Sequence, residues 1–180
     1  MGFSEQFIAS LSSRDLRDDE FHHDLDAIGA AARAGDLGAL LCRVKYADGS
    51  VNRLSEGNSG NLAQLLRVWT AKVGETGRTR RWAKANTAWD IQAANTLYRR
   101  VAEASLAHWL DGKCKRCGGT GIAPPSRRVA CAACQGSGDA PVSCPGSFER
   151  EKIKEMVGEL EGLLQTHGAR AARLLGRRRR

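Results

Sequence analysis

Two short stretches with the same pattern of cysteines and glycines carry the clearest chemistry in this sequence. CKRCGGTG begins at Cys114 and CAACQGSG begins at Cys131, so each reads C-x-x-C-x-G-x-G. A C-x-x-C turn directs two thiolates at one ion, and two such turns complete the tetrahedral ligand set of a structural zinc site. The pattern predicts one zinc ion per chain, bound by Cys114, Cys117, Cys131 and Cys134. Because four protein ligands leave no open position, we expect a structural metal rather than a catalytic one.

Two other roles for these cysteines stay open from the sequence alone. An iron–sulfur cluster also accepts four thiolates, and a redox C-x-x-C pair normally accompanies a strand–helix–strand pattern, which is not visible here. Of the remaining cysteines, Cys144 is a candidate spare ligand, and Cys42 lies on an apolar helical face as a small buried hydrophobe. No secretory signal or membrane-spanning run is visible, so we expect reduced thiols in the cytoplasm.

The glycines that follow each cysteine pair have a geometric role. Gly119 and Gly136 stand where the backbone must turn back so that amide hydrogens face the sulfurs, and this turn needs a positive φ. Gly121 and Gly138 are expected to let the chain leave the turn in close contact with its surroundings. Four thiolates leave a net negative charge on the zinc site, which nearby cations are expected to offset: Lys113, Lys115, Arg116, Arg127 and Arg128.

Helical periodicity dominates the sequence on both sides of the two C-x-x-C-x-G-x-G turns, which are called the knuckles below. We expect a helix capped by Asn61 and broken at GETG, residues 74–77, and then a long helix from about Thr79 to Leu110 that Gly112 terminates. A last helix is expected from Phe148 to about residue 164. No alternating strand of five or more residues is visible. The predicted fold is mainly α, a helical protein with a small zinc-organised knuckle insert between a long helix and a C-terminal helix.

The expected domain organisation follows from these elements. An acidic helical region is predicted at 1–46 and a turn-rich linker at 47–61. A helical core at 62–112 precedes the zinc knuckle module at 113–140, and a C-terminal helix at 147–167 precedes a basic tail at 168–180. We expect the tail to be disordered, because it holds six arginines and no acid.

Charge is unevenly spread along the chain. The formal net charge is +8, but residues 1–26 hold seven acids and two arginines and so carry −5, which leaves +13 on the remainder. A basic balance of this size indicates a polyanionic partner, most often nucleic acid, while ordinary solubility charge is the alternative. We predict DNA as the partner, with no membrane and no small-molecule substrate.

Three basic groups are candidates for contact with nucleic acid. The first lies beside Trp82 and contains Arg78, Arg80, Arg81 and Lys84; the second, around the knuckles, contains Lys115, Arg116, Arg127 and Arg128; the third is the tail. The alternatives are a solvated helix face for the first group and compensation of thiolate charge for the second. Trp82, Trp89 and Trp109 follow the helical period, so we interpret them as core residues rather than platforms for base stacking.

No catalytic arrangement is visible in the sequence. The four histidines are scattered, and no Ser/His/acid triad or pair of carboxylates has a motif behind it. His108 precedes the knuckles closely enough to be considered as a group beside the metal ligands, although a surface position on the long helix is the simpler interpretation. We therefore predict that the protein is not an enzyme.

The knuckle repeat resembles two known families. C-x-x-C-x-G-x-G is the unit of DnaJ-type chaperone zinc domains, which use four copies for two ions, whereas this chain has two copies and no His-Pro-Asp tripeptide. The segment LYRRVAEASLAHWLDGKCKRCGGTGIAPPSRRVACAACQGSG, residues 97–138, is similar to the lambdoid phage late-gene antitermination proteins called Q, which place a helix directly before such a knuckle pair. The stretch RRWAKAN, residues 80–86, is similar to a Trp-and-basic stretch upstream of the knuckles in such phage regulators.

The resemblance to the Q family implies a mechanism. Proteins of this family bind a DNA element in a late promoter, join RNA polymerase paused just downstream and travel with it, so that it ignores terminators. The resemblance implies bacterial RNA polymerase with its sigma factor as a partner, in the bacterial host cytoplasm, with the first two basic groups as candidates for contact with DNA or polymerase. Two alternatives stay open: a DnaJ-like zinc module acting as a protein-binding or chaperone adaptor, and a zinc-stabilised DNA-binding regulator that never enters the elongation complex.

Overall fold

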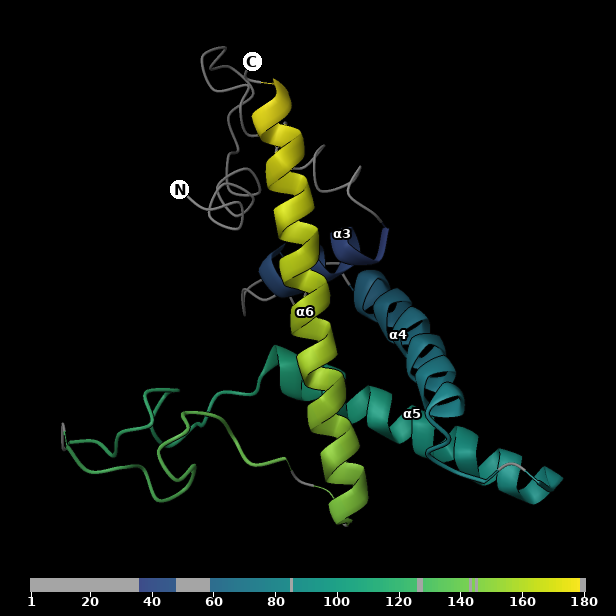
Figure 1. Ribbon diagram of the computed structural model, residues 1–180. Coiled ribbons are helices and arrows are strands. Elements are labelled where there is room, and N and C mark those ends of the chain that lie inside the picture. The colour runs from purple at the N-terminus through teal and green to yellow at the C-terminus, as the bar shows by residue number, and fades with distance from the viewer. Residues whose placement is uncertain are drawn as a thin grey trace. The chain divides into compact units, whose positions relative to one another are not determined.

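The computed structural model describes residues 36–47, 59–84, 86–125, 128–142, 144 and 146–178. In these ranges the chain is mainly helical, as predicted, with the helices α3 (Asp36–Cys42), α4 (Ser59–Thr79), α5 (Ala88–Leu110) and α6 (Ser147–Arg178) and a short π-helical segment, η2 (Arg43–Ala47), after α3 (Figure 1). The described ranges contain no strand, only two isolated β-bridges. Most of the predicted acidic region and of the predicted linker, together with Arg127, lie outside the described residues.

The chain divides into two compact units, each described by itself. The first comprises residues 1–68 and 161–180, and the second comprises residues 69–160. In the first unit, Leu41, Cys42 and Val44 are buried, as are His167 and Ala171 of α6. Gly38 lets α3 approach α6, because a Cβ on Gly38 would overlap the imidazole ring of His167.

The second unit has an apolar core with one buried polar link. Trp69 of α4 is fully buried, and its Nε1 donates a 3.0 Å hydrogen bond to the hydroxyl of Ser105 on α5, which is also fully buried. That hydroxyl in turn donates to the carbonyl of Ala102 at 3.1 Å, so the indole N–H is satisfied inside the core. The other fully buried residues of this unit's helices include Val73, Val101, Ile153, Met156 and Leu160.

The predicted break in the helix at residues 74–77 is wrong. α4 begins at Ser59, ahead of the predicted cap Asn61, and runs through both glycines to Thr79. A helical glycine costs only about 1 kcal/mol relative to alanine, and Gly77 has a packing role. A Cβ on Gly77 would overlap the ring of Tyr98, so this glycine allows α4 and α5 to approach closely.

The long helix predicted from about Thr79 begins later, at Ala88. The chain leaves the helical conformation after Thr79, where Arg81 has a φ of 53°, and Thr87 caps α5. The Thr87 hydroxyl accepts a hydrogen bond from the Asp90 N–H, and the Asp90 carboxylate accepts one from the Thr87 N–H, each at 3.1 Å. This capping box fixes the first turn of α5.

Both ends of the knuckle module meet helices. α5 ends at Leu110, close to the predicted end, and the Asp111 N–H donates to the Ala107 carbonyl at 3.0 Å. α6 begins at Ser147 as predicted but continues to Arg178, so the prediction of a disordered tail from 168 is wrong. The stretch ARAARLL consists of good helix formers, and Ala171 within it is fully buried.

In the described ranges, no helix combines the length and the apolar character needed to cross a membrane.

Candidate metal centre

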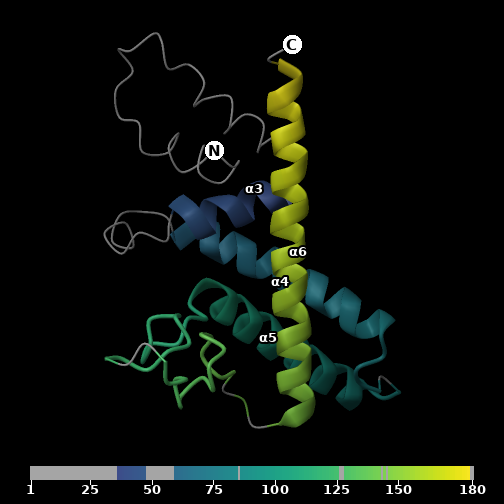
Figure 2. The ribbon, with the colours of Figure 1, turned by 60° about the vertical axis from the view of Figure 1, so that its left-hand side comes forward.

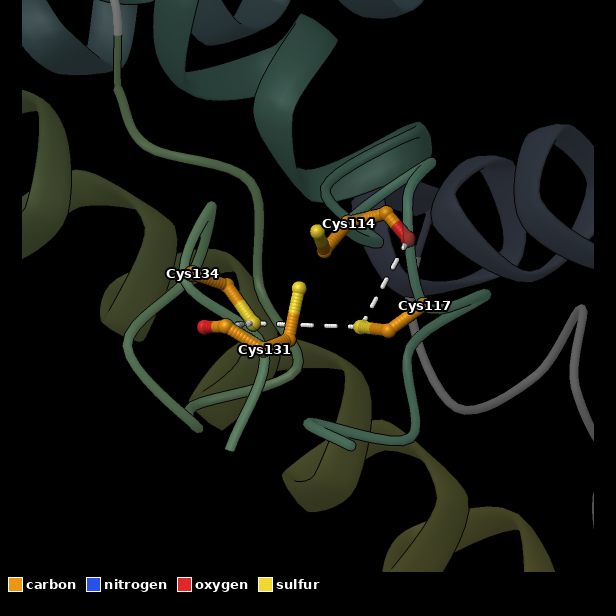
Figure 3. A group of neighbouring side chains, drawn as sticks. All are labelled: Cys114, Cys117, Cys131 and Cys134. Atoms are coloured by element: carbon orange, nitrogen blue, oxygen red, sulfur yellow. Dashed lines mark hydrogen bonds between the residues drawn. The ribbon is translucent and has the colours of Figure 1, made fainter. Parts of the chain in front are cut away.

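The four predicted ligands come together in the segment between α5 and α6, and Figure 2 shows that this segment is not helical. The sulfur atoms of Cys114, Cys117, Cys131 and Cys134 all lie within 4.8 Å of one another, and all four residues are buried. Figure 3 shows the four side chains pointing toward a common point from two separate turns. The four-cysteine cluster that the sequence predicted is therefore present, and it is able to hold a metal ion.

The two knuckles are joined by a reciprocal pair of backbone hydrogen bonds. The Cys114 N–H donates to the Gly138 carbonyl, and the Cys131 N–H donates to the Gly121 carbonyl, both at 2.8 Å. The first residue of each knuckle thus bonds to the last residue of the other. An isolated β-bridge lies next to each of these hydrogen bonds, one between Lys113 and Asp139 and one between Ile122 and Ala130. A 2.7 Å hydrogen bond from the Ala140 N–H to the Gly112 carbonyl closes the module at its base.

The knuckle glycines have the conformations that the sequence predicted. Gly119 and Gly136 have φ values of 86° and 85°, and Gly121 and Gly138 have φ values of 74° and 82°. The second pair also has no room for a side chain, since a Cβ on Gly121 would overlap the Gly136 carbonyl oxygen and one on Gly138 would overlap the Gly119 carbonyl oxygen. Glycine is the residue that meets both requirements.

Backbone N–H groups point at two of the sulfurs. The Gly121 N–H donates to Cys117 Sγ at 3.3 Å, and the Gly138 N–H donates to Cys134 Sγ at 3.4 Å. Burial alone raises the pKa of the Cys117 thiol, but the N–H of Gly121 and the neighbouring donors outweigh it and lower this pKa to about 6. The thiolate is the form of cysteine that binds a metal ion, so these N–H groups favour the ligand form of Cys117.

The donor set fits a tetrahedral ion with soft ligands. A Zn–S bond of about 2.3 Å in tetrahedral geometry requires sulfurs about 3.8 Å apart, and the distance between Cys117 Sγ and Cys134 Sγ is 3.8 Å. None of the six cysteines is in a disulfide. Four thiolates fill the coordination sphere, so the arrangement can cross-link the two turns but offers no position for a substrate.

The other two cysteines stand apart from this cluster. Cys144 is half-buried and its Sγ donates to the Gly146 carbonyl at 3.4 Å, so the structure does not add it to the four ligands. Cys42 is 1% exposed, and burial raises the pKa of its thiol to about 11. The interpretation of Cys42 as a buried small hydrophobe is confirmed.

The basic residues predicted around the knuckles lie on the surface of the module. Lys113, Lys115, Arg116 and Arg128 are exposed, and Arg127 lies outside the described residues. Lys115 Nζ is 3.6 Å from the carboxylate of Asp111, an exposed pair that contributes little to stability.

The basic group beside Trp82 divides into two kinds of residue. Arg78, Arg81 and Lys84 are exposed, whereas the Arg80 guanidinium forms an ion pair with Glu155 of α6 and lies 4.0 Å from the carboxylate of Glu159. Arg80 therefore anchors the connection between α4 and α5 to α6.

The interpretation of the tryptophans as core residues holds for Trp109, in part for the half-buried Trp82, and not for Trp89. Trp109 is buried, and the half-buried Trp82 lies edge-on to Tyr98 with 6.2 Å between ring centres. Trp89 is 79% exposed. Trp89 stands in the first turn of α5, outside the buried face that Ala94, Tyr98 and Val101 form further along the helix.

One hollow beside the knuckles had no signal in the sequence pattern. A cavity of about 700 Å³ lies between the second knuckle and α6, and its polar lining includes His108, Gln135, Ser137, Asp139, Arg150 and Lys154. These six residues come from three separate segments of the chain, namely α5, the second knuckle and α6, so only the folded structure brings them together.

No family model, curated protein or solved structure matches the chain. The centre is accordingly characterised by its own residues, namely four buried cysteines on two glycine-rich turns that exchange backbone hydrogen bonds.

Proposed function

We propose that this protein is a zinc-stabilised transcription antiterminator that binds late-promoter DNA and bacterial RNA polymerase and suppresses termination. The observation that carries the proposal is the closed four-cysteine cluster placed directly after α5. A helix followed by such a knuckle pair is the arrangement that resembles the Q family. A centre with four protein ligands also suits a binding protein better than an enzyme.

In this proposal the metal is zinc, with one ion per chain held by the four clustered cysteines. Zinc would supply a cross-link between the two turns, whose own contacts are a few backbone hydrogen bonds. A module without a helix or an extended strand has little apolar core of its own, and a structural metal is a common substitute for such a core.

The exposed cations of the two basic groups supply the proposed contact with DNA. Phosphate contacts from arginine and lysine give affinity that falls with salt, without reading sequence. The candidates for this role are the exposed residues Arg78, Arg81, Lys84, Lys115, Arg116 and Arg128. Arg80 is assigned instead to positioning the connection between α4 and α5, because its guanidinium faces Glu155.

Transcription past a terminator tests the proposal. Purified bacterial RNA polymerase is given late-promoter templates from the source genome, each followed by a terminator, with and without the zinc-loaded protein. We expect increased read-through with the protein and none with the Cys131→Ser variant. The Cys144→Ser variant, which changes a cysteine outside the cluster, is expected to retain read-through.

The same assay separates the alternatives. Absence of read-through on every late-promoter template would contradict the proposal. Sequence-specific DNA binding without read-through would favour a regulator that stays at the promoter, and suppression of client aggregation without DNA binding would favour a chaperone adaptor.

A further inference from the structure

Trp89 is the most exposed of the large apolar side chains in the described ranges. It is 79% exposed, and Ile91 beside it is 48% exposed. Single exposed apolar residues are common on protein surfaces, so exposure alone does not define a site. The surroundings of Trp89 supply the further observations.

Trp89 stands at one end of an exposed face of α5. Trp89, Gln92, Ala93 and Thr96 occupy successive positions on one side of the helix, and together they line a shallow hollow of about 180 Å³. All four residues are exposed. A broad indole beside small and polar side chains is a flat surface on which a planar ring can lie.

The chain next to this surface is strongly basic. Residues 77–89 contain four cations and no acid; all four are exposed, and Arg80 among them is paired with Glu155. Chain connectivity keeps the Cα atoms of Lys84 and Trp89 within about 18 Å, so one extended ligand can reach both. The first acid after the cations, Asp90, is held by the capping box, where its carboxylate accepts the Thr87 N–H.

The surface is held in place by the rest of the second unit. The capping box fixes the first turn of α5, Trp82 packs against Tyr98, and Arg80 is paired with Glu155. An aromatic side chain on a fixed helix loses little freedom on binding. These contacts fix the helix backbone that carries Trp89.

We infer that Trp89 and the neighbouring cations bind single-stranded DNA, with the indole of Trp89 stacked on an unpaired base. A positively charged track combined with an exposed aromatic ring is the combination that single-stranded nucleic acid recognition uses. A paired duplex keeps the faces of its bases stacked inside, whereas an opened promoter exposes them. The inference rests on the proposed function and specifies which form of DNA this surface contacts.

Titration of the full, zinc-loaded chain tests the inference, with affinity taken from the fluorescence anisotropy of end-labelled probes and stacking from the protein's tryptophan emission. The probes are an oligo(dT) of about twelve nucleotides, a matching oligo(rU) and a duplex of unrelated sequence. We expect oligo(dT) to quench the tryptophan emission and Trp89→Ala to weaken oligo(dT) binding about tenfold, while duplex affinity changes less than about twofold. Trp89→Phe is expected to keep most of the affinity and to lose the quenching, which assigns the signal to this ring. Lys84→Ala is expected to weaken binding of both DNA forms and to reduce their salt dependence.

Several results would overturn the inference, and they are distinguishable from failure of the proposed function. Unchanged oligo(dT) affinity in Trp89→Ala, with duplex binding and read-through intact, overturns the stacking role and leaves the antitermination proposal standing. Tighter binding of oligo(rU) than of oligo(dT) overturns the assignment to DNA. Loss of polymerase binding with unchanged oligo(dT) affinity in Trp89→Ala identifies a protein contact instead. Absence of oligo(dT) binding by the unmodified chain overturns the inference, while read-through on late-promoter templates decides the antitermination proposal separately. Because Trp89 is 79% exposed, we expect all variants to have the same melting temperature as the parent.

Discussion

Replacement of Cys131 by serine is expected to abolish metal binding and to unfold the knuckle module. Cys131 is fully buried, and its sulfur lies among the other three sulfurs. Its backbone N–H donates a hydrogen bond to the Gly121 carbonyl. A serine hydroxyl is a hard, neutral ligand in a site built for thiolates. Structural zinc contributes about 10–16 kcal/mol of apparent binding energy at neutral pH, so losing it removes more free energy than a small module can replace.

Metal analysis and limited proteolysis measure this effect. The variant is expected to retain less than about a tenth of the parent's metal and to be cleaved rapidly within residues 113–140, while the helical circular dichroism signal largely persists. Cys144→Ser is the matched control, because Cys144 lies outside the cluster, and it is expected to match the parent. Full metal content and an unchanged proteolysis pattern in Cys131→Ser would show that the cluster is not the metal site.

Replacement of Gly121 by alanine is expected to have the second-largest effect. The residue has a φ of 74°, a conformation that costs a residue with a Cβ about 1–2 kcal/mol. The added methyl group would also overlap the Gly136 carbonyl oxygen, which is backbone and cannot rotate away. We expect a loss of about 3 kcal/mol or more in the free energy of unfolding of the module, with weaker metal binding as a consequence.

Gly118 provides the control that separates the two causes. It also has a positive φ, 62°, but a Cβ there would have nothing within 4 Å. Gly118→Ala is therefore expected to cost only the backbone term, about 1–2 kcal/mol. Competition with a chromophoric chelator, followed for both variants and the parent, measures the difference. Equal metal affinity for the two variants would contradict the close approach of the knuckles.

The sequence predicts the metal centre better than it predicts the helices around it. The cluster depends on two local turns, and the four cysteines and the glycines that follow them specify those turns within eight residues each. The positive φ values of Gly119 and Gly136 follow from the same local requirement. What the sequence does not reveal is the exchange of hydrogen bonds between the turns, because that contact depends on segments that are distant along the chain.

The predicted helix boundaries differ from the observed ones at the break expected at 74–77, at the start of α5 and at the end of α6. Gly74 and Gly77 predict a break in the helix, whereas in the folded chain Gly77 allows the close approach of Tyr98. The stretch TAWD at 87–90 contains the capping box that starts α5, and this signal would have placed the boundary and moved Trp89 out of the core. The arginine-rich composition of the tail predicts disorder, but the alanines and leucines after residue 168 continue α6.

The central claim is that four thiolates hold one zinc ion in a closed site. The most direct measurement is metal stoichiometry together with X-ray absorption at the metal edge on the full, reduced chain. The account predicts one zinc per chain with four sulfur neighbours at about 2.3 Å and no oxygen or nitrogen neighbour. Iron as the bound metal, a light-atom ligand in the first coordination sphere, or a folded module that binds no metal would contradict it.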